Sequence, residues 1–230
     1  MFINVIISLF SPMIMDKLTI FDLDNTLLEG DSDRNWGIFL TEKNIVNQDY
    51  LNESEKFYNN YYEGSLDIDG FLKFCLKPLQ DNSLEYLLEL RSEYIENKIK
   101  PIVLDKAMNE VLNQKTKSEV IIATATNSFI TRPIADLFEV KTLIATEFEI
   151  VDNKFTGRVT GEPCFRNGKL NKVLDWMTEN NYNKMNTTFY SDSFNDLPLL
   201  KAVNTAIVVD GDEKLIMEAK KNDWQSISFR

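Results

Sequence analysis

The alternation of apolar and polar positions divides the chain into strands and helices. Residues 18–23 form a short, nearly continuous apolar run, which is typical of a parallel strand buried on both faces. Beyond residue 119, strands are expected at 120–125, 142–146, 186–192 and 205–210, with helices between them and a hairpin over 148–159 that turns at Asp152 and Asn153. Repeated βα units predict an open parallel sheet with helices on both faces.

Between the first and second strands the pattern has helical periodicity. Helices are expected at 36–44, 50–64, 67–79, 83–99 and 102–116, with Pro78 and Pro101 marking breaks. Six aromatic residues fall here: Phe57, Tyr58, Tyr61, Tyr62, Phe71 and Phe74. We interpret them as the core of a helical subdomain, and the alternative is a stacking pocket for a ring-bearing substrate.

The first residues are apolar but too short to span a bilayer, and they lack a basic region. We interpret residues 1–15 as an extension outside the core, with Met15 as a candidate natural start. The alternatives are a weak membrane-targeting segment and an extra edge strand or helix. The expected organisation is a catalytic core at 16–30 and 106–230, with a helical insertion at 31–105.

Composition narrows the chemistry. A net charge of −11 argues against nucleic-acid or anionic-membrane binding, and the absence of histidine excludes histidine-dependent hydrolases and histidine-ligated zinc. Cys75 and Cys164 give no disulfide framework or zinc spacing, lack the arginine of a cysteine-phosphatase loop, and suit a reducing cytoplasm. Carboxylates, lysine, hydroxyls and amides are left to carry the reaction.

Polar residues follow several predicted strands. Asp22 and Asp24 leave the first strand on the same side, because side chains two apart in a strand point the same way. Residues 124–127 end the second strand, residues 191–196 follow a later one, and Lys169 opens a helix. The carboxyl ends of parallel strands meet at one sheet edge, so we expect these groups to converge. Two adjacent carboxylates repel each other unless a cation or hydrogen bonds intervene.

Four sequence motifs appear in order: "DLDNT", "ATATN", the lysine of "RNGKL", and "SDSFND". With them the chain resembles the haloacid dehalogenase-like phosphohydrolases, from about Leu18 to its last residue. The position of the helical insertion is similar to that in the phosphoserine phosphatase-like branch, which includes phosphoserine and histidinol-phosphate phosphatases. The resemblance implies a Rossmann-like parallel core with an inserted helical cap, and phosphatase activity on a small phosphomonoester.

The resemblance assigns the paired aspartates to different steps. Asp22 is expected to attack phosphorus and form a phosphoaspartyl intermediate. Asp24 is expected to protonate the leaving oxygen and then to deprotonate water. Mg²⁺ is the expected cofactor, with the Asp22 and Asp192 carboxylates and the Asp24 backbone carbonyl as its protein ligands.

The remaining motif residues are expected to stabilise charge. Thr126, preferred over Thr124, is expected to bind a phosphoryl oxygen, and Lys169, preferred over Lys172, to stabilise the nucleophile and the phosphoryl group. Asp196 is expected to hold either the metal's waters or Lys169.

Substrate recognition is expected to begin at Asp31, which lies where an acidic residue of the similar phosphoserine phosphatases meets the substrate amine. The alternative is that Asp31 simply caps a helix. Arg34 is a candidate for binding a substrate carboxylate, and Asn127 and Asn195 are further candidate substrate ligands. Other bases, including Arg166, are interpreted as solvated.

Rival functions share parts of this pattern. A haloacid dehalogenase would lack the second aspartate, and a receiver-like phosphoacceptor module would need no helical insertion. A phosphomutase of the same superfamily has the same motifs. We expect a cytoplasmic phosphatase that binds a small phosphomonoester and neither nucleic acid nor membrane, with its oligomeric state open.

Overall fold

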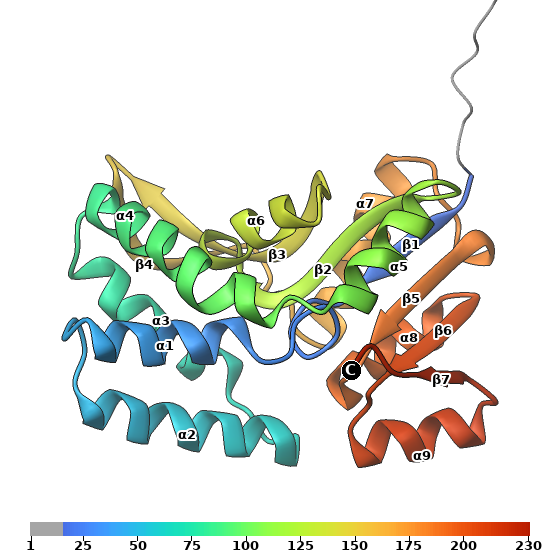
Figure 1. The fold of residues 1–230 in the computed structure, drawn as a ribbon, viewed down its shortest axis with the longest axis horizontal. Coiled ribbons are helices and arrows are strands. Elements are labelled where there is room, and N and C mark those ends of the chain that lie inside the picture. The colour runs from blue at the N-terminus through green and yellow to red at the C-terminus, as the bar shows by residue number, and fades with distance from the viewer. Residues whose placement is uncertain (1–15) are drawn as a thin grey trace, which may run out of the picture.

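The computed structural model describes residues 16–230, so the expected extension at 1–15 lies outside the described residues. In the described part of the chain, seven strands form one sheet in the order β4-β3-β2-β1-β5-β6-β7 (Figure 1). Neighbouring strands are parallel except for β3 and β4. The strands are β1 (Leu18–Phe21), β2 (Glu119–Asn127), β3 (Thr142–Val151), β4 (Lys154–Thr160), β5 (Thr187–Ser191), β6 (Thr205–Val209) and β7 (Gln225–Ile227).

Five α-helices of the described chain lie between β1 and β2, and the others lie between or after the later strands. The first four are α1 (Ser32–Glu42), α2 (Gln48–Glu63), α3 (Ile68–Gln80) and α4 (Leu84–Tyr94). The rest are α5 (Asp105–Lys115), α6 (Ser128–Leu137), α7 (Asn167–Glu179), α8 (Leu197–Ala202) and α9 (Glu213–Lys221). Below, "cap" means the segment from α1 to α4, which in Figure 1 lies at one end of the sheet.

The two faces of the sheet pack in separate cores. Leu18 and Ile20 of β1 pack in a core that includes α7, α8 and α9, whereas Phe21 belongs to the core that includes α5, α6 and the cap. Alternate strand residues point to opposite faces, so one short apolar run supplies both cores. This arrangement confirms the expected α/β class, with a parallel sheet covered on both sides.

The β3–β4 hairpin forms the antiparallel edge of the sheet. Its turn residues, Asp152 and Asn153, have φ angles of 49° and 58°. These two residue types tolerate the left-handed region better than most, and a tight hairpin turn requires it. The expected hairpin and its turn are confirmed.

Several expected helix limits differ from the structure. Helix α1 begins at Ser32, four residues before the expected start, because the Asp31 side chain accepts a hydrogen bond from the Arg34 backbone N–H. Pro78 lies inside α3, and the helix ends two residues later, at Gln80. The single helix expected at 83–99 ends at Tyr94 and continues as a π-helical turn over Ile95–Ile99.

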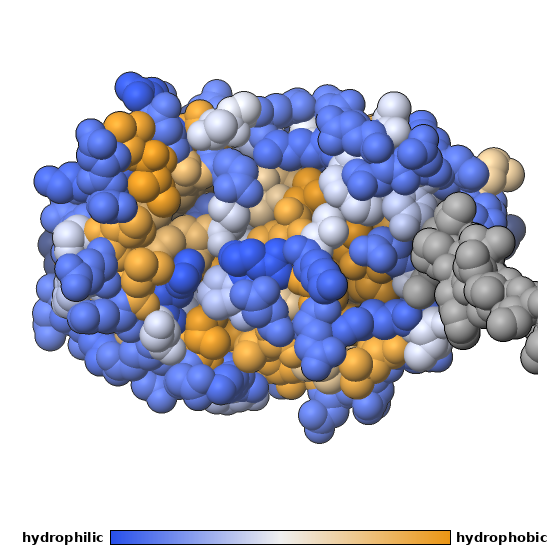
Figure 2. All heavy atoms as spheres, turned by 90° about the horizontal axis from the view of Figure 1, so that it is seen from above, coloured by the Kyte–Doolittle hydropathy of each residue, from blue (hydrophilic) through white to orange (hydrophobic). Residues whose placement is uncertain are grey.

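The surface is mostly hydrophilic, as expected for the charge content. In Figure 2, hydrophobic residues show between hydrophilic ones, including towards the end formed by α4 and the β3–β4 hairpin, where Leu88, Ile150 and Val151 are exposed. Across residues 16–230, every helix is too short or too polar to cross a membrane.

Candidate active site

Asp22 follows β1 directly and lies at the floor of a cavity between the sheet edge and the cap. Its side chain is buried, with 6% of its surface exposed. One carboxylate oxygen accepts a hydrogen bond from Lys169 Nζ at 2.8 Å, and the other lies 3.4 Å from Thr26 Oγ1. The backbone N–H donates to the Tyr190 carbonyl, which fixes the chain beside β5. Burial raises the pKa of Asp22, and Lys169 opposes that rise.

Asp24 lines the same cavity with a different set of partners. Its Oδ1 accepts from the Ser32 backbone N–H at 2.6 Å, and its Oδ2 accepts from Thr126 Oγ1 at 2.8 Å. Burial, together with the negative charge of Asp31, raises the pKa of Asp24 to about 7. A carboxyl group with such a pKa can gain and lose a proton near neutral pH, as a general acid and base requires.

Lys169 bridges two buried carboxylates. Its Nζ lies 2.8 Å from Asp22 Oδ1 and 2.7 Å from Asp196 Oδ1, and only 3% of the residue is exposed. The residue before it, Gly168, is needed for close packing, because a Cβ there would lie 2.0 Å from the Pro163 carbonyl oxygen. Lys172 instead donates to the Ala145 carbonyl, so the structure places Lys169 in the cavity, as expected.

The two candidate threonines at the end of β2 have different orientations. Thr124 Oγ1 accepts a hydrogen bond from the Thr126 backbone N–H at 3.2 Å, whereas Thr126 Oγ1 donates to Asp24. Thr124 is almost fully buried, with 1% of its surface exposed. The hydroxyl of Thr126 thus contacts Asp24 and that of Thr124 does not, and the preference for Thr126 as the ligand of a phosphoryl oxygen stays a prediction.

Asp192 and Asp196 extend the polar floor from the end of β5. Asp196 is held by Lys169 and by Ser191 Oγ at 2.8 Å, and burial raises its pKa to about 6. Asp192 accepts from Thr26 Oγ1 at 3.1 Å. Burial and the charges of Asp22 and Asp196 raise the pKa of Asp192 well above its usual range.

Thr26 contacts two of the floor carboxylates and was not a candidate site residue from the sequence. It is fully buried, its hydroxyl reaches both Asp22 and Asp192, and it accepts from the Asp192 backbone N–H at 3.1 Å. A hydroxyl has one proton, so it can donate to only one of these carboxylates at a time. Its place as the last residue of "DLDNT" was the available signal.

The floor carries more negative charge than its lysine can neutralise. Asp22 and Asp196 contact one ammonium group, that of Lys169, and the negative charge of Asp192 lies close to both carboxylates. Oxygen donors with excess negative charge fit a hard divalent cation such as Mg²⁺. Residues 16–230 contain no group of three or more histidine, cysteine, aspartate or glutamate side chains arranged to hold a metal. A cation here would therefore also need backbone oxygen and water ligands, which Mg²⁺ commonly retains.

The cap supplies a second anionic region of the cavity, formed by Asp31 and Asp33. Tyr58 OH lies 3.4 Å from a carboxylate oxygen of each, and Cys75 Sγ donates to Asp33 at 3.2 Å. Burial is the main cause that raises the pKa of both aspartates to about 6. Asp31 also caps α1, which confirms the capping interpretation, and because it lines the cavity as well, its role toward a substrate amine stays a prediction.

Asp33 was not a candidate from sequence. An acidic residue in the first turn of a helix has an ordinary explanation in the helix dipole, so no local signal separates Asp33 from a solvated one.

Aromatic residues form the wall of the cavity beside these carboxylates. The cap aromatics pack with one another and against the core, as expected, and five of them also line the cavity, while Phe74 stacks on Tyr50 at a centroid distance of 4.2 Å. Their stacking on a ring-bearing substrate stays a prediction. Phe165 adds a ring from the core. The aromatic lining residues are Phe57, Tyr58, Tyr61, Tyr62, Phe71 and Phe165.

The other candidate substrate residues differ in position. Asn127 and Asn195 line the cavity, although Asn127 also caps α6 and Asn195 accepts from Arg166. Arg34 is not among the lining residues, and its guanidinium pairs with Glu55 at 2.6 Å on the surface. The expectation that Arg34 binds a substrate carboxylate is therefore corrected. Of the described residues that line the cavity, Lys169 is the one with a cationic side chain.

Comparison with known proteins places this geometry in a family. Residues 19–201 match the haloacid dehalogenase-like hydrolases. The chain belongs to this family. It is 38% identical to a Neisseria meningitidis protein named histidinol-phosphatase, over 94% of this chain and 100% of that protein. It is 28% identical to a phosphoserine phosphatase of Mycobacterium tuberculosis, over 95% of this chain and 73% of that protein.

Solved structures of other proteins share the fold. A Bordetella pertussis Tohama I protein of unknown function superposes with a TM-score of 0.86 at 34% identity, over 93% of this chain and 98% of that one. A substrate-bound phosphoserine phosphatase superposes with a TM-score of 0.70 at 19% identity, over 92% of each chain, which supports the fold alone. The fold class, the hydrolase family and the phosphatase class expected from the sequence are confirmed. The roles of individual residues remain predictions.

Proposed function

We propose that this phosphatase hydrolyses a small, amine-bearing phosphomonoester through a phosphoaspartyl intermediate on Asp22. The observation that supports the proposal is that one cavity has two chemically distinct ends. At the sheet edge, a buried nucleophile contacts Lys169 and lies near a second carboxyl group whose pKa is about 7. At the cap, two aspartates and several aromatic rings line the cavity, where we expect the leaving group to lie.

In the first step, a carboxylate oxygen of Asp22 forms a bond to phosphorus as the bond to the leaving oxygen breaks. Asp24 donates its proton to that oxygen. In the second step, Asp24 takes a proton from water, which attacks phosphorus, releases phosphate and regenerates the Asp22 carboxylate. Lys169 and Thr126 stabilise negative charge on the phosphoryl oxygens in both steps.

The Asp22 and Asp192 carboxylates, with the Asp24 backbone carbonyl, are the residues that would hold Mg²⁺. When bound, the ion neutralises charge that the protein leaves uncompensated at the floor and lowers the repulsion between the nucleophile and an anionic phosphate. Asp196 is committed to Lys169, so its role in this scheme is to orient the ammonium group.

Among amine-bearing substrates, the cap end of the cavity favours histidinol phosphate over phosphoserine. Asp31 and Asp33 would attract the amine, and the tyrosine and phenylalanine rings offer faces for an imidazole. Phosphoserine also carries a carboxylate, and the described cap residues that line the cavity include no lysine or arginine to pair with it. The name of the Neisseria meningitidis relative agrees with this choice.

The test is phosphate release with Mg²⁺ over a panel of histidinol phosphate, phosphoserine, a sugar phosphate and a nucleoside monophosphate. We expect the highest kcat/KM for histidinol phosphate and a lower value for phosphoserine. A higher kcat/KM for the sugar or nucleoside phosphates would contradict amine recognition. Transfer of phosphate within the substrate, without release of free phosphate, would identify a phosphomutase instead.

A further inference from the structure

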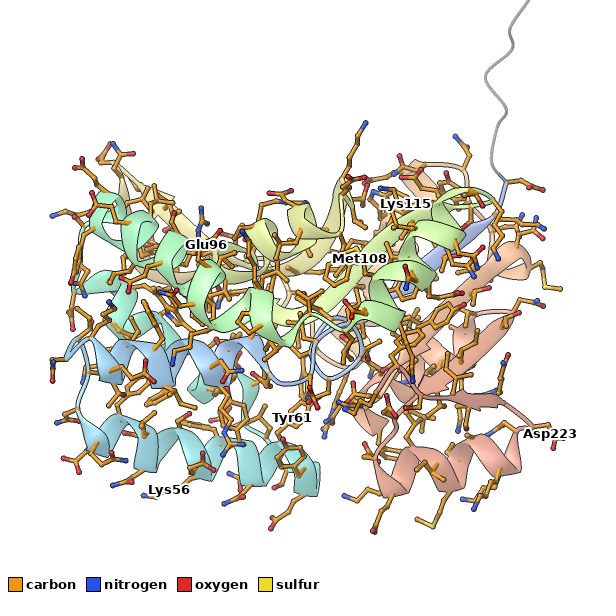
Figure 3. All side chains as sticks on the ribbon, viewed as in Figure 1. Lys56, Tyr61, Glu96, Met108, Lys115 and Asp223 are labelled. Atoms are coloured by element: carbon orange, nitrogen blue, oxygen red, sulfur yellow. The ribbon has the colours of Figure 1, made fainter. Side chains whose placement is uncertain are left out.

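The end of α2 contacts the loops that carry the catalytic candidates. Tyr61 OH lies 2.8 Å from Ser193 Oγ, and the Tyr61 backbone carbonyl accepts from Asn195 Nδ2 at 3.4 Å. Figure 3 shows Tyr61 at the end of α2 that faces the C-terminal part of the molecule. Ser193 directly follows Asp192 in the sequence, and Asn195 directly precedes Asp196. The cap therefore contacts the segment that holds two of the floor carboxylates.

Arg166 connects the same helix end to the segment that carries Lys169. Its Nη2 donates to the Gly64 carbonyl at 2.7 Å, and its Nε donates to Asn195 Oδ1 at 2.9 Å. The guanidinium also lies over the Phe165 ring, 4.9 Å from its centroid. One planar side chain thus joins three segments that are distant in sequence, an arrangement for which the fixed fork of arginine is well suited.

The position of Arg166 explains why this contact can affect catalysis. Arg166 immediately precedes α7, three residues before Lys169, and its carbonyl accepts the Leu170 N–H in the first turn. Its φ angle of 51° is unusual for a residue other than glycine, and such a conformation persists only where surrounding contacts hold it. The two side-chain hydrogen bonds are contacts of this kind. Losing them would free the backbone at the point where α7 begins.

The acceptor on the cap is the Gly64 carbonyl, which lies at the C-terminal end of a helix. Gly64 ends α2 with a φ of 84°, and its carbonyl lies at the negative end of the helix dipole. A cationic donor is favoured there, even though this hydrogen bond lies at the solvent-exposed surface. The bond therefore forms when the end of α2 lies against the α7 loop.

We propose that Arg166 is a positioning residue that couples cap closure to the placement of Lys169. This inference rests on the proposed role of Lys169 in phosphoryl transfer. It also corrects the interpretation of Arg166 as a solvated base. When α2 lies against the core, Arg166 holds the start of α7 in the conformation that directs the Lys169 ammonium group at Asp22.

Lys214 provides a matched control. From α9 it donates to the Tyr62 carbonyl at 2.9 Å and to the Glu63 carbonyl at 3.3 Å, at the same end of α2. It is exposed, and it contacts neither α7 nor the catalytic candidates through these bonds. A cation that only tethers the cap should behave like Lys214.

The experiment compares Arg166→Ala and Lys214→Ala in the full chain, with a small aryl phosphate that does not need the cap for recognition. For Arg166→Ala we expect kcat to fall by about 10- to 100-fold with little change in KM, because a small displacement of a catalytic group has effects of this size. Lys214→Ala should stay within about twofold of wild type. Millimolar guanidinium, far below denaturing concentrations, should restore part of the lost kcat in Arg166→Ala alone.

A second measurement does not depend on turnover. Hydrogen exchange at the Gly168 and Leu170 amides, which hydrogen-bond to Phe165 and Arg166 carbonyls, should become about tenfold faster in Arg166→Ala and should not change in Lys214→Ala. Equal kcat losses or equal exchange in the two variants would overturn the proposal, as would wild-type kcat in Arg166→Ala. A wild-type protein without phosphatase activity would contradict the proposed function, and the exchange comparison would still test the contact itself.

Discussion

The two ends of the cavity each contain aspartates, but these aspartates have different partners at the two ends. At the sheet edge, Asp22 and Asp196 each contact Lys169 at 2.8 Å or less, and Lys169 is almost fully buried. At the cap, Asp31 and Asp33 share the hydroxyl of Tyr58, which lies 3.4 Å from each. The carboxylates at the sheet edge are thus held by an ion pair, whereas Asp31 and Asp33 form no ion pair with any residue in 16–230.

This difference has a physical reason. Preorganised groups stabilise charge in a transition state without having to reorient during the reaction, so tight contacts suit the catalytic end. A recognition site gains affinity when a ligand supplies the missing partner of a half-buried charge. The uncompensated carboxylates of the cap are therefore suited to a cationic leaving group, and the following predictions test that division.

The largest effect is expected at the nucleophile. Asp22→Asn should lower kcat by at least about 10⁴-fold for every substrate, because an amide oxygen cannot form the covalent intermediate. The measurement is phosphate release, together with circular dichroism to show that the variant is folded. Activity above a few per cent of wild type, in protein free of wild-type contamination, would exclude Asp22 as the nucleophile.

Metal removal should also affect the catalytic end and leave the cap unchanged. A chelator is expected to abolish phosphate release, and added Mg²⁺ to restore it, because the floor carboxylates would otherwise repel an anionic phosphate. Asp192→Ala should raise the Mg²⁺ concentration needed for half-maximal activity. Full activity in excess chelator would contradict a metal requirement.

Asp24→Asn is expected to give a smaller loss, about 10²- to 10⁴-fold, because proton transfer is lost and the nucleophile remains. The loss should be smallest for formation of the Asp22 intermediate from an aryl phosphate, whose leaving group needs no proton. Single-turnover kinetics with aryl and alkyl phosphates measure this difference. Equal losses for the two substrate types would assign Asp24 a different role.

At the cap, Asp31→Asn should lower kcat/KM about tenfold for an amine-bearing substrate, with a much smaller change for its deamino analogue. Asparagine caps a helix as well as aspartate does, so α1 should keep its start. Asp67→Asn is the matched control, because Asp67 caps α3 and does not line the cavity. An equal loss of kcat/KM for both substrates would show that Asp31 does not bind the amine.

The smallest effect is a pH dependence of recognition. Burial raises the pKa of Asp33 to about 6, so this carboxylate is charged above about pH 6 and becomes neutral below it. The KM for an amine-bearing alkyl phosphate should therefore rise as the pH falls from about 7.5 to about 5, relative to its deamino analogue. The analogue cancels the ionisation of the phosphate itself. Asp33→Asn should reduce this difference, and an identical pH profile for both substrates in wild type would contradict the prediction.

Local patterns were sufficient to locate most of the catalytic end. The apolar run of β1 and the two-residue spacing of Asp22 and Asp24 depend only on strand geometry, and the structure brings both to the cavity. Lys169 was distinguishable from Lys172 by its place at the helix start. Resemblance to a family, and not periodicity, supplied the expected chemistry of these residues.

Other features had weak or misleading local signals. The three-residue strand β7 was missed because it is short and largely exposed, so its side chains show no burial pattern. The π-helical turn at Ile95–Ile99 has the same apolar spacing as a continuing α-helix. Pro78 was expected to mark a break, whereas α3 continues through it and ends two residues later, at Gln80.

The sequence by itself determined the parallel sheet, the helical insertion and the residues that follow the buried strands, because these depend on periodicity within short segments. Only the tertiary structure decided the positions of Asp33, Arg34 and Arg166. The contact between Arg166 and Gly64 joins residues 102 positions apart, and Arg34 pairs with Glu55 on another helix. Whether a charged side chain is solvated, paired or directed into a cavity depends on which distant segments surround it. The local sequence pattern contains no information about those distant segments.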